Sequence, residues 1–314
     1  APEFSLAPVA RHLGEILKHD VAIAGDVAGP QAQSAASALE PGEEKNVPEL
    51  ARRLASLADL YVNDAFGAAH RAHASTVGVA QFLPAYAGYL MQGELDALRR
   101  LADQPERPYV AILGGAKVSD KLAVIGNLAS RVDAILVGGG MANTFLLSQG
   151  HPIGKSLAEP DFVGQARAVL DEARERGVQV MMPSDVVVAQ SLDDAPQSVS
   201  IDGVNDVVAI YDIGPETARR FAGRVRGAKT VFWNGPMGVF ERPAFSQGTL
   251  AVARAVADSD AFSVVGGGDS VAAIEQAGLA DRISHISTGG GASLEYVEGR
   301  TLPGVAALES SAER

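Results

Sequence analysis

The sequence contains no cysteine. This absence excludes disulfide bonds, thiolate metal ligands and cysteine nucleophiles together, and it is compatible with a reducing cytoplasm, where we expect the protein to act. Long hydrophobic runs are also absent, because no stretch approaches the roughly 20 apolar residues of a membrane span. No N-terminal stretch has the basic, apolar and small-residue order of a secretion signal. We therefore expect no membrane partner.

Basic residues are few: 26 lysines and arginines stand against 38 aspartates and glutamates, which gives a formal net charge of −12. This balance argues against non-specific binding to nucleic acid or to anionic membranes. An anionic substrate would therefore need a local basic cluster. With 314 residues, 47% of them hydrophobic, the chain can bury a large core and is long enough for about two domains.

Short apolar runs alternate with helical segments such as residues 161–176 in the second part of the chain. The runs are residues 110–113, 134–137, 178–182, 207–211, 230–233, 262–265 and 285–287. This alternation predicts a parallel, doubly wound α/β sheet. An amphipathic helix over residues 86–101, ended by Pro105 and Pro108, marks the domain boundary.

The first part of the chain has its own helix and strand signals. Helices are expected within residues 6–17 and 31–39, with strands at 21–26 and 61–64. Asn46 and Pro48 suit the N-cap and first turn of another helix. Its apolar positions would be Leu50, Leu54, Leu57 and Leu60.

A glycine-rich turn at residues 266–270 joins a buried apolar run to a helix start. Such a turn exposes backbone N–H groups at a helix N-terminus and predicts an anion site. Asp269 would repel a phosphate unless a cation lies between them, so we expect Mg²⁺ between Asp269 and nucleotide phosphate oxygens. The alternative is that Asp269 or Ser270 only caps the helix.

Similar turns follow four other strands, at residues 113–117, 137–141, 233–238 and 287–292. The carboxyl ends of parallel strands lie at one edge of a sheet, so these turns would surround a common ligand. Lys117 and Lys121, four residues apart on an opening helix, would point to the same side and favour a strong anion. The alternative is a pair of solvated surface lysines.

A basic cluster lies earlier in the chain, where His70, Arg71 and His73 fall within four residues. Arg71 suits a carboxylate or phosphate as a bidentate partner. The alternative is that the histidines fill a loop and Arg71 pairs with a nearby acid.

The sequence does not match the common phosphate-binding motifs. Residues 150–156 have one residue too few for a P-loop and follow a helix rather than a strand. The dinucleotide fingerprint lacks its third glycine at each triple-glycine turn. Neither Gly-x-Ser-x-Gly nor His-Glu-x-x-His occurs, so the hydrolase and zincin motifs are missing as well.

Seven segments together resemble the phosphoglycerate kinase family, in the family's order from about residue 5 to residue 305. They are YVNDAFG (61–67), AHRAH (69–73), GGAKVSDK (114–121), GGGMA (138–142), WNGPMGVFE (233–241), GGGDS (266–270) and STGGGASLE (287–295). The resemblance implies reversible phosphoryl transfer from 1,3-bisphosphoglycerate to MgADP, giving 3-phosphoglycerate and MgATP in glycolysis. It implies a two-lobed α/β fold with a parallel, Rossmann-like sheet in each lobe, and a monomer.

The resemblance also implies a division of the chain and a set of site residues. Residues 1–85 would form the substrate lobe, 86–104 the hinge helix, 105–300 the nucleotide lobe and 301–314 a tail returning to the first lobe. The expected substrate ligands are Arg71 and His70, and the expected catalytic groups are Lys117, Gly290, Gly291 and Arg71. The expected nucleotide ligands are Lys121, Gly138, Gly139, Gly214, Asn234, Glu241, Gly267, Gly268, Asp269 and Ser270, with Asp269 also on Mg²⁺.

The chain departs from the family pattern in the substrate lobe. The family's first strand and its Ser-His-Leu-Gly-Arg-Pro segment do not precede Ala1, and its Glu-Asn-Leu-Arg-Phe segment is missing between Leu39 and Pro41. This lobe is therefore incomplete in the 314 residues, and we expect them to bind nucleotide but to show little or no turnover. Two further hypotheses are a nicotinamide-dependent oxidoreductase and a non-catalytic nucleotide-binding protein.

Overall fold

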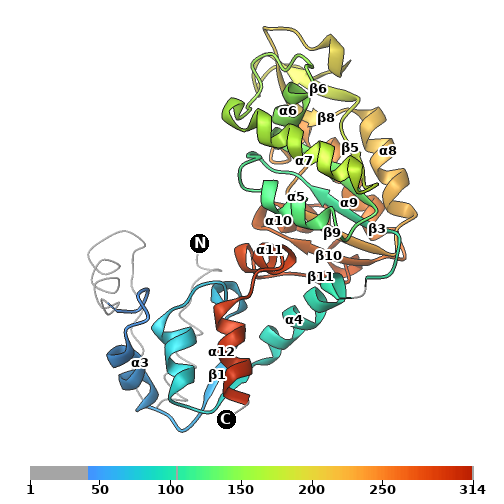
Figure 1. The fold of residues 1–314 in the computed structure, drawn as a ribbon. Helices are drawn as coiled ribbons and strands as arrows, with labels where there is room; N and C mark the ends of the chain where they lie inside the picture. Colours follow the sequence, from blue (N-terminus) through green and yellow to red (C-terminus); the bar gives the residue numbers. More distant parts are fainter. Residues whose placement is uncertain (1–41, 104, 313–314) are drawn as a thin grey trace.

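The computed structural model describes residues 42–103 and 105–312. The elements expected at residues 6–17, 21–26 and 31–39 lie outside the described residues. Figure 1 shows a larger upper lobe and a smaller lower lobe. The smaller lobe contains α3 (Pro48–Ala55), β1 (Tyr61–Asn63), β2 (Ala85–Ala87) and α12 (Pro303–Ala312), and α4 (Tyr89–Ala102) runs between the lobes.

The larger lobe is built on a six-stranded parallel sheet with the strand order β11-β10-β9-β3-β4-β5. The strands are β3 (Tyr109–Leu113), β4 (Ala134–Val137), β5 (Gln179–Met181), β9 (Thr230–Asn234), β10 (Phe262–Gly266) and β11 (His285–Ile286). Both β3 and β9 are buried along their whole length, as expected for parallel strands covered on both faces. The predicted parallel sheet is confirmed for these six strands.

Helices cover both faces of this sheet. One face carries α5 (Leu122–Leu128), α6 (Gly139–Ser148), α7 (Val163–Glu175) and α11 (Gly291–Val297), and the other carries α8 (Pro215–Arg226), α9 (Gln247–Ala257) and α10 (Gly268–Gln276). Because side chains alternate along a strand, Ala111 and Leu113 pack in the first core while Val110 and Ile112 pack in the second. The sheet is therefore doubly wound.

The strand register places the glycine turns side by side. Leu113, the last residue of β3, lies opposite Val137 on β4 and Asn234 on β9. Asn234 in turn lies opposite Gly266, the last residue of β10. Four strands thus end at the same level of the sheet, and the turns that follow them emerge at one edge.

The strand predicted at residues 207–211 is not part of this sheet. It is observed as β8 (Ala209–Ile213), and it pairs antiparallel with β6 (Asp185–Ala189), which also pairs with β7 (Gln197–Ser200). The parallel assignment of this segment was wrong, because an apolar run does not reveal the direction of its partner. This three-stranded sheet has its own small core around Val186 and Val188.

The smaller lobe corrects two predictions about helix starts and lengths. Val47, not Asn46, is the N-cap of α3, and Leu57 and Leu60 lie beyond the helix end, exposed to solvent. The predicted strand at residues 61–64 is confirmed as β1, which pairs in parallel with β2.

The helix between the lobes begins three residues later than predicted. Residues 85–87 form β2, and α4 starts at Tyr89 because the side chain of Asp64 accepts a hydrogen bond from the backbone N–H of Met91 at 2.9 Å. Tyr89 and Leu90, the first two residues of this helix, are exposed. The helix α12 packs against β2, where the N–H of Ala85 donates to the hydroxyl of Ser311 at 3.0 Å.

Candidate active site

A cavity of about 380 Å³ lies where the turns after β3, β9 and β10 meet. We call it the phosphate cavity, after the ligand that its glycine turns and lysines suit. It is lined by seven of the predicted site residues: Lys117, Lys121, Asn234, Gly267, Gly268, Asp269 and Ser270. Three separate chain segments, within residues 114–121, 234–235 and 267–270, thus line one cavity, as the sequence analysis expected.

The floor of the phosphate cavity is made of backbone that bonds to backbone. The N–H of Gly114 donates to the carbonyl of Asn234 at 3.0 Å, and that of Gly115 donates to Pro236 at 3.1 Å. Gly235 has a φ of 98°, and a Cβ placed on it would lie 2.2 Å from the carbonyl oxygen of Gly114. Only glycine fits this position, so the close packing of two turns depends on it.

The two lysines line the same cavity, but they are not on a helix. The helix α5 begins at Leu122, so Lys117 and Lys121 lie in the loop before it, and the predicted helical spacing was wrong. Glu159 fixes this loop by accepting hydrogen bonds from the backbone N–H of Ser119 at 2.9 Å and from its hydroxyl at 2.8 Å. The surface-lysine alternative is wrong for Lys121, which is buried, while Lys117 is exposed.

Burial lowers the pKa of Lys121 to about 8, although nearby Asp120 and Glu298 act in the opposite direction. Its ammonium group donates a hydrogen bond to the side-chain oxygen of Asn234. A buried cation beside an amide oxygen and open to a cavity gains stability when an anion enters. This environment therefore favours a phosphate group next to Lys121.

The turn after β10 presents an acid to the cavity and buries a hydroxyl. Gly267, with a φ of 87°, is the N-cap of α10, so the alternative in which Asp269 or Ser270 caps the helix is wrong. Asp269 is exposed in the first helical turn. Ser270 is fully buried, and its hydroxyl accepts a hydrogen bond from the N–H of Gly235 at 2.5 Å. Ser270 thus joins the turns after β9 and β10.

The carboxylates of the phosphate cavity fit a nucleotide-bound Mg²⁺. Asp120 and Asp269 both line it, and Mg²⁺ is commonly held by one or two carboxylates together with substrate phosphates. Within residues 42–103 and 105–312, no cluster of three or more His, Asp or Glu side chains is placed to hold a metal alone. The metal would therefore share its coordination with the nucleotide.

A larger cavity of about 520 Å³ adjoins the phosphate cavity and shares Gly115, Ala116 and Asp269 with it. Two further predicted residues, Gly139 and Glu241, also line it. Its walls are largely apolar, with contributions from β8 and from the segment after β9. An apolar space beside an anion site suits the base and ribose of a nucleotide.

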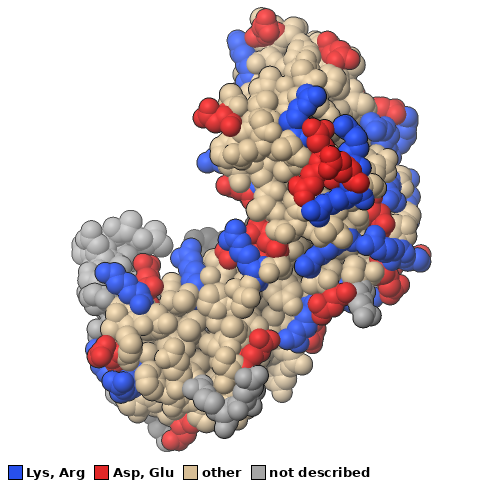
Figure 2. Space-filling model, viewed as in Figure 1, with Lys and Arg blue, Asp and Glu red and all other residues tan. Residues whose placement is uncertain are grey.

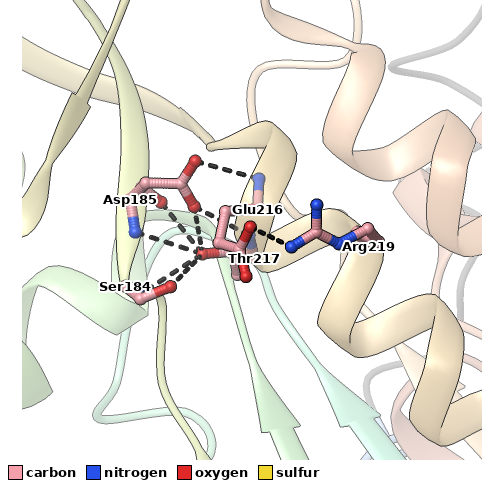
Figure 3. A network of polar contacts seen from close by, with 5 residues as sticks. All are labelled: Ser184, Asp185, Glu216, Thr217 and Arg219. Carbon is pink, nitrogen blue, oxygen red and sulfur yellow. Dashed lines mark hydrogen bonds and ion pairs between the residues drawn. The ribbon is translucent and has the colours of Figure 1, made fainter.

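Two predicted glycines, Gly138 and Gly214, do not line this larger cavity. A Cβ on Gly138 would lie 2.5 Å from the sulfur of Met237. Gly214 is the N-cap of α8, and a Cβ there would lie 2.2 Å from the carboxylate of Asp185. Figure 3 shows what holds this carboxylate in place: Asp185 accepts hydrogen bonds from the N–H groups of Glu216 at 3.0 Å and Thr217 at 2.7 Å at the start of α8.

The larger cavity contains two charged residues that the sequence analysis did not select, Lys155 and Asp212. Burial raises the pKa of Asp212 to about 7, even though its carboxylate accepts hydrogen bonds from the N–H groups of Gly248 at 2.7 Å and Ile213 at 2.9 Å. An acid at the end of an apolar strand was the available signal for Asp212. Lys155 lies in residues 150–156, which were rejected as a P-loop, and it was not selected for that reason.

The predicted groups nearest the smaller lobe form a separate set. A Cβ on Gly291 would lie 3.5 Å from Nε2 of His70, and one on Gly289 would clash with the ring of Phe66, so the two lobes meet here. Gly290, with a φ of 50°, is the N-cap of α11. Neither Gly290 nor Gly291 lines the phosphate cavity or the larger cavity, and Arg71 is exposed.

Glu94 is a buried acid on α4 that the sequence analysis missed. Its carboxylate accepts hydrogen bonds from the N–H of Thr288 at 2.6 Å, from the hydroxyl of Thr288 at 2.7 Å and from Ser287 at 2.8 Å, and it lies 2.9 Å from Nε2 of His285. Burial acts to raise the pKa of Glu94, but these hydrogen bonds outweigh it and lower the pKa to about 2. Its place between Met91 and Leu98 on the apolar face was the available signal.

A doubly wound sheet, glycine turns at its carboxyl edge, and a cavity with lysines and an exposed carboxylate define a two-lobed, nucleotide-using phosphotransferase. A family model described as phosphoglycerate kinase matches residues 1–300. The chain belongs to the phosphoglycerate kinase family. Its reaction is the reversible transfer of a phosphoryl group between 1,3-bisphosphoglycerate and ADP, with Mg²⁺ and the nucleotide bound together.

Individual relatives agree with the family model. The phosphoglycerate kinase of Moorella thermoacetica is 57% identical over 321 residues, which cover 98% of this chain and 82% of the relative. That of Herpetosiphon aurantiacus is 56% identical, with the same coverage. The solved structure of phosphoglycerate kinase from Coxiella burnetii is 43% identical, has a TM-score of 0.86 and covers 99% of this chain and 82% of its own. These findings contradict the nicotinamide-dependent hypothesis.

No helix in the described ranges is long and apolar enough to cross a membrane.

Proposed function

We propose that the two adjoining cavities together form the nucleotide site of this kinase. The larger cavity takes the base and ribose, with Gly138, Gly139 and Gly214 shaping its wall and Glu241 at the ribose hydroxyls. The phosphate cavity takes the phosphates, with Lys121, Asn234, Gly267, Gly268 and Ser270 around them. The supporting observation is that seven predicted residues line one cavity that opens into a second, apolar one.

Asp269 would hold Mg²⁺ on the nucleotide phosphates in this proposal. When bound, Mg²⁺ neutralises charge on the phosphate oxygens. The side chains then position the reactants. Lys117, exposed in the same cavity as Lys121, reaches toward the transferring phosphoryl group. Gly290 and Gly291 offer N–H groups to that phosphoryl group from the start of α11.

The substrate side of the proposed site lies in the smaller lobe. Arg71 binds the 3-phosphoglycerate end and His70 lies beside it, close to Gly291. Two anionic reactants on separate lobes have to approach in line and exclude water, so closure of the lobes is part of the reaction. The supporting observation is the direct contact between lobes at residues 66–70 and 289–291.

The division of the chain and the surroundings of the enzyme belong to the same proposal. Residues 1–85 are the substrate lobe, 86–104 the hinge, 105–300 the nucleotide lobe and 301–314 a returning tail. The enzyme acts as a cytoplasmic monomer without nucleic acid or membrane partners, which its net charge of −12 and its lack of cysteine support.

Lys117→Met tests the assignment, because Lys117 is exposed and its loss leaves the fold intact. We expect kcat to fall by about 100-fold or more, as for other groups that stabilise a transition state, while MgADP affinity changes by less than about threefold. Lys229→Met, an exposed lysine outside both cavities, is the control. An unchanged kcat in Lys117→Met would contradict the assignment.

A further inference from the structure

A third cavity, of about 690 Å³, lies between α8 and α9 and is bordered by β6 and β7. We call it the α8–α9 cavity. Small side chains create it, because Ala218 and Ala222 on α8 face Ala251 and Ala255 on α9. Its volume is within the range of roughly 300 to 1,000 Å³ that is typical of small-molecule sites. None of the predicted site residues lines it.

Three arginines line this apolar space: Arg219 and Arg226 from α8 and Arg254 from α9. The guanidinium group of Arg219 is already bound by Glu216 (Figure 3). Within the described ranges, the side chains of Arg226 and Arg254 have no acidic partner. Figure 2 shows basic side chains along the edge of the upper lobe where α8 runs.

The acid in the lining, Asp258, does not neutralise these arginines, since its carboxylate lies 2.7 Å from the guanidinium group of Arg282. Two uncommitted guanidinium groups therefore border an apolar cavity in a chain with a net charge of −12. Guanidinium groups bind carboxylate, sulfonate and phosphate oxygens, and the alanine walls accept an apolar body.

We propose that the α8–α9 cavity binds a small amphipathic anion, with a fused-ring or aliphatic body and one acidic head group, and that its occupancy changes the affinity for MgADP. The head group lies between Arg226 and Arg254. The apolar body lies between the alanines of the two helices. The binding claim goes beyond the proposed function, whereas the coupling claim rests on it.

The coupling follows from a shared wall. Ile213 lines both the α8–α9 cavity and the 520 Å³ cavity proposed to hold the base and ribose, called the nucleotide cavity below. Gly248 lines the α8–α9 cavity and donates its N–H to Asp212, which lines the nucleotide cavity. A ligand that moves the start of α9 therefore displaces a group in the nucleotide cavity, and such an effect is reciprocal between the two sites.

Fluorescence titration with anilinonaphthalene sulfonate tests the site. The titration is done with saturating MgADP, so that the nucleotide cavity is filled. We expect one probe per chain, an affinity about tenfold or more weaker in Arg254→Glu and in Arg226→Glu, and an affinity within about twofold of wild type in Arg220→Glu, an exposed α8 residue outside the lining. Ala251→Leu, which fills the cavity, should also weaken binding.

Two results would overturn the site: complete, competitive displacement of the probe by MgADP, which would place the probe in the nucleotide site, or equal probe affinity in wild type, Arg254→Glu and Ala251→Leu. For the coupling, we expect saturating probe to change the MgADP dissociation constant by about threefold or more in wild type and by much less in Arg254→Glu. An unchanged constant in wild type would overturn the coupling. Loss of MgADP binding in the probe-free wild type would instead overturn the proposed function.

Discussion

The carboxylate of Glu94 accepts two hydrogen bonds from Thr288, one from its backbone N–H at 2.6 Å and one from its hydroxyl at 2.7 Å. Glu94 lies on the helix between the lobes, and Thr288 immediately precedes the turn at Gly289 and Gly290. The position of α4 is therefore tied directly to the turn proposed to face the transferring phosphoryl group. Any movement of the lobes about α4 acts on that turn.

Glu94→Gln should destabilise the protein at neutral pH, because an amide NH₂ replaces one oxygen and faces N–H and O–H donors. We expect a loss of about 2 to 4 kcal/mol in the free energy of unfolding, measured by urea denaturation. Asp96→Asn, an exposed acid on the same helix, is the control and should change this energy by less than about 0.5 kcal/mol.

The same network predicts an acid dependence. Since the pKa of Glu94 is lowered to about 2 in the folded protein, its contribution is complete above the unfolded pKa near 4.5 and is lost as the pH falls toward 2. The loss corresponds to about 3 kcal/mol. The stability difference between wild type and Glu94→Gln should therefore shrink between about pH 4.5 and 2. A difference that stays constant over this range would contradict the assignment.

Lys121 should take up a proton when MgADP binds. Burial lowers its pKa to about 8 in the free protein, and phosphates in the cavity favour the charged ammonium form. Affinity for MgADP should then fall as the pH rises above 8. Calorimetry near pH 8.5, in two buffers that differ in ionisation enthalpy, measures the uptake. The proton uptake should disappear in Lys121→Met and persist in Lys117→Met. Equal binding heats in both buffers for the wild type would contradict proton uptake by Lys121.

Gly235→Ala should disrupt the floor of the phosphate cavity. The substitution places a Cβ 2.2 Å from the carbonyl oxygen of Gly114 at a φ of 98°. We expect a loss of at least about 2 kcal/mol in stability and a tenfold or greater loss in MgADP affinity. The control is Gly223→Ala on α8, where a Cβ meets nothing within 4 Å. This control should stabilise the protein by about 0.5 to 1 kcal/mol. A normal MgADP affinity in Gly235→Ala would argue against this packing.

Asp269→Asn should distinguish the contribution of the metal to nucleotide affinity from that of the phosphates. An exposed carboxylate at this position attracts Mg²⁺ but repels bare phosphate, so MgADP affinity should fall about tenfold while metal-free ADP affinity stays constant or rises. Equilibrium binding with and without chelator measures both. Glu275→Gln, an exposed acid later on α10, is the control. Equal losses for both ligands would remove Asp269 from the metal site.

The parallel sheet and the phosphate cavity could be predicted because their signals are local. Each strand is a short apolar run, and the glycines of each turn directly follow that run. Adjacent residues therefore indicate both where a strand ends and where the backbone turns into the cavity. Asp269 and Gly267 were found in this way. The direction of β8 was not, because its antiparallel partner β6 is chosen by packing rather than by any residue within β8.

Contacts between distant residues explain the remaining errors. The lysine loop fails to become a helix because Glu159 holds Ser119 from 40 residues away. Glu94 finds its partners 191 to 194 residues later in the chain, which no local pattern indicates. Gly214 does not line the larger cavity, and the carboxylate of Asp185 occupies the space that a Cβ on Gly214 would enter.

The contact between Ala85 and Ser311 spans 226 positions and joins β2 to α12. During synthesis on the ribosome, β2 emerges long before α12, and the whole six-stranded sheet is translated in between. Such non-local pairing slows folding and leaves early apolar surface uncovered. The first lobe to be made should therefore be the last to reach its native state, which makes it the part most dependent on protection during translation.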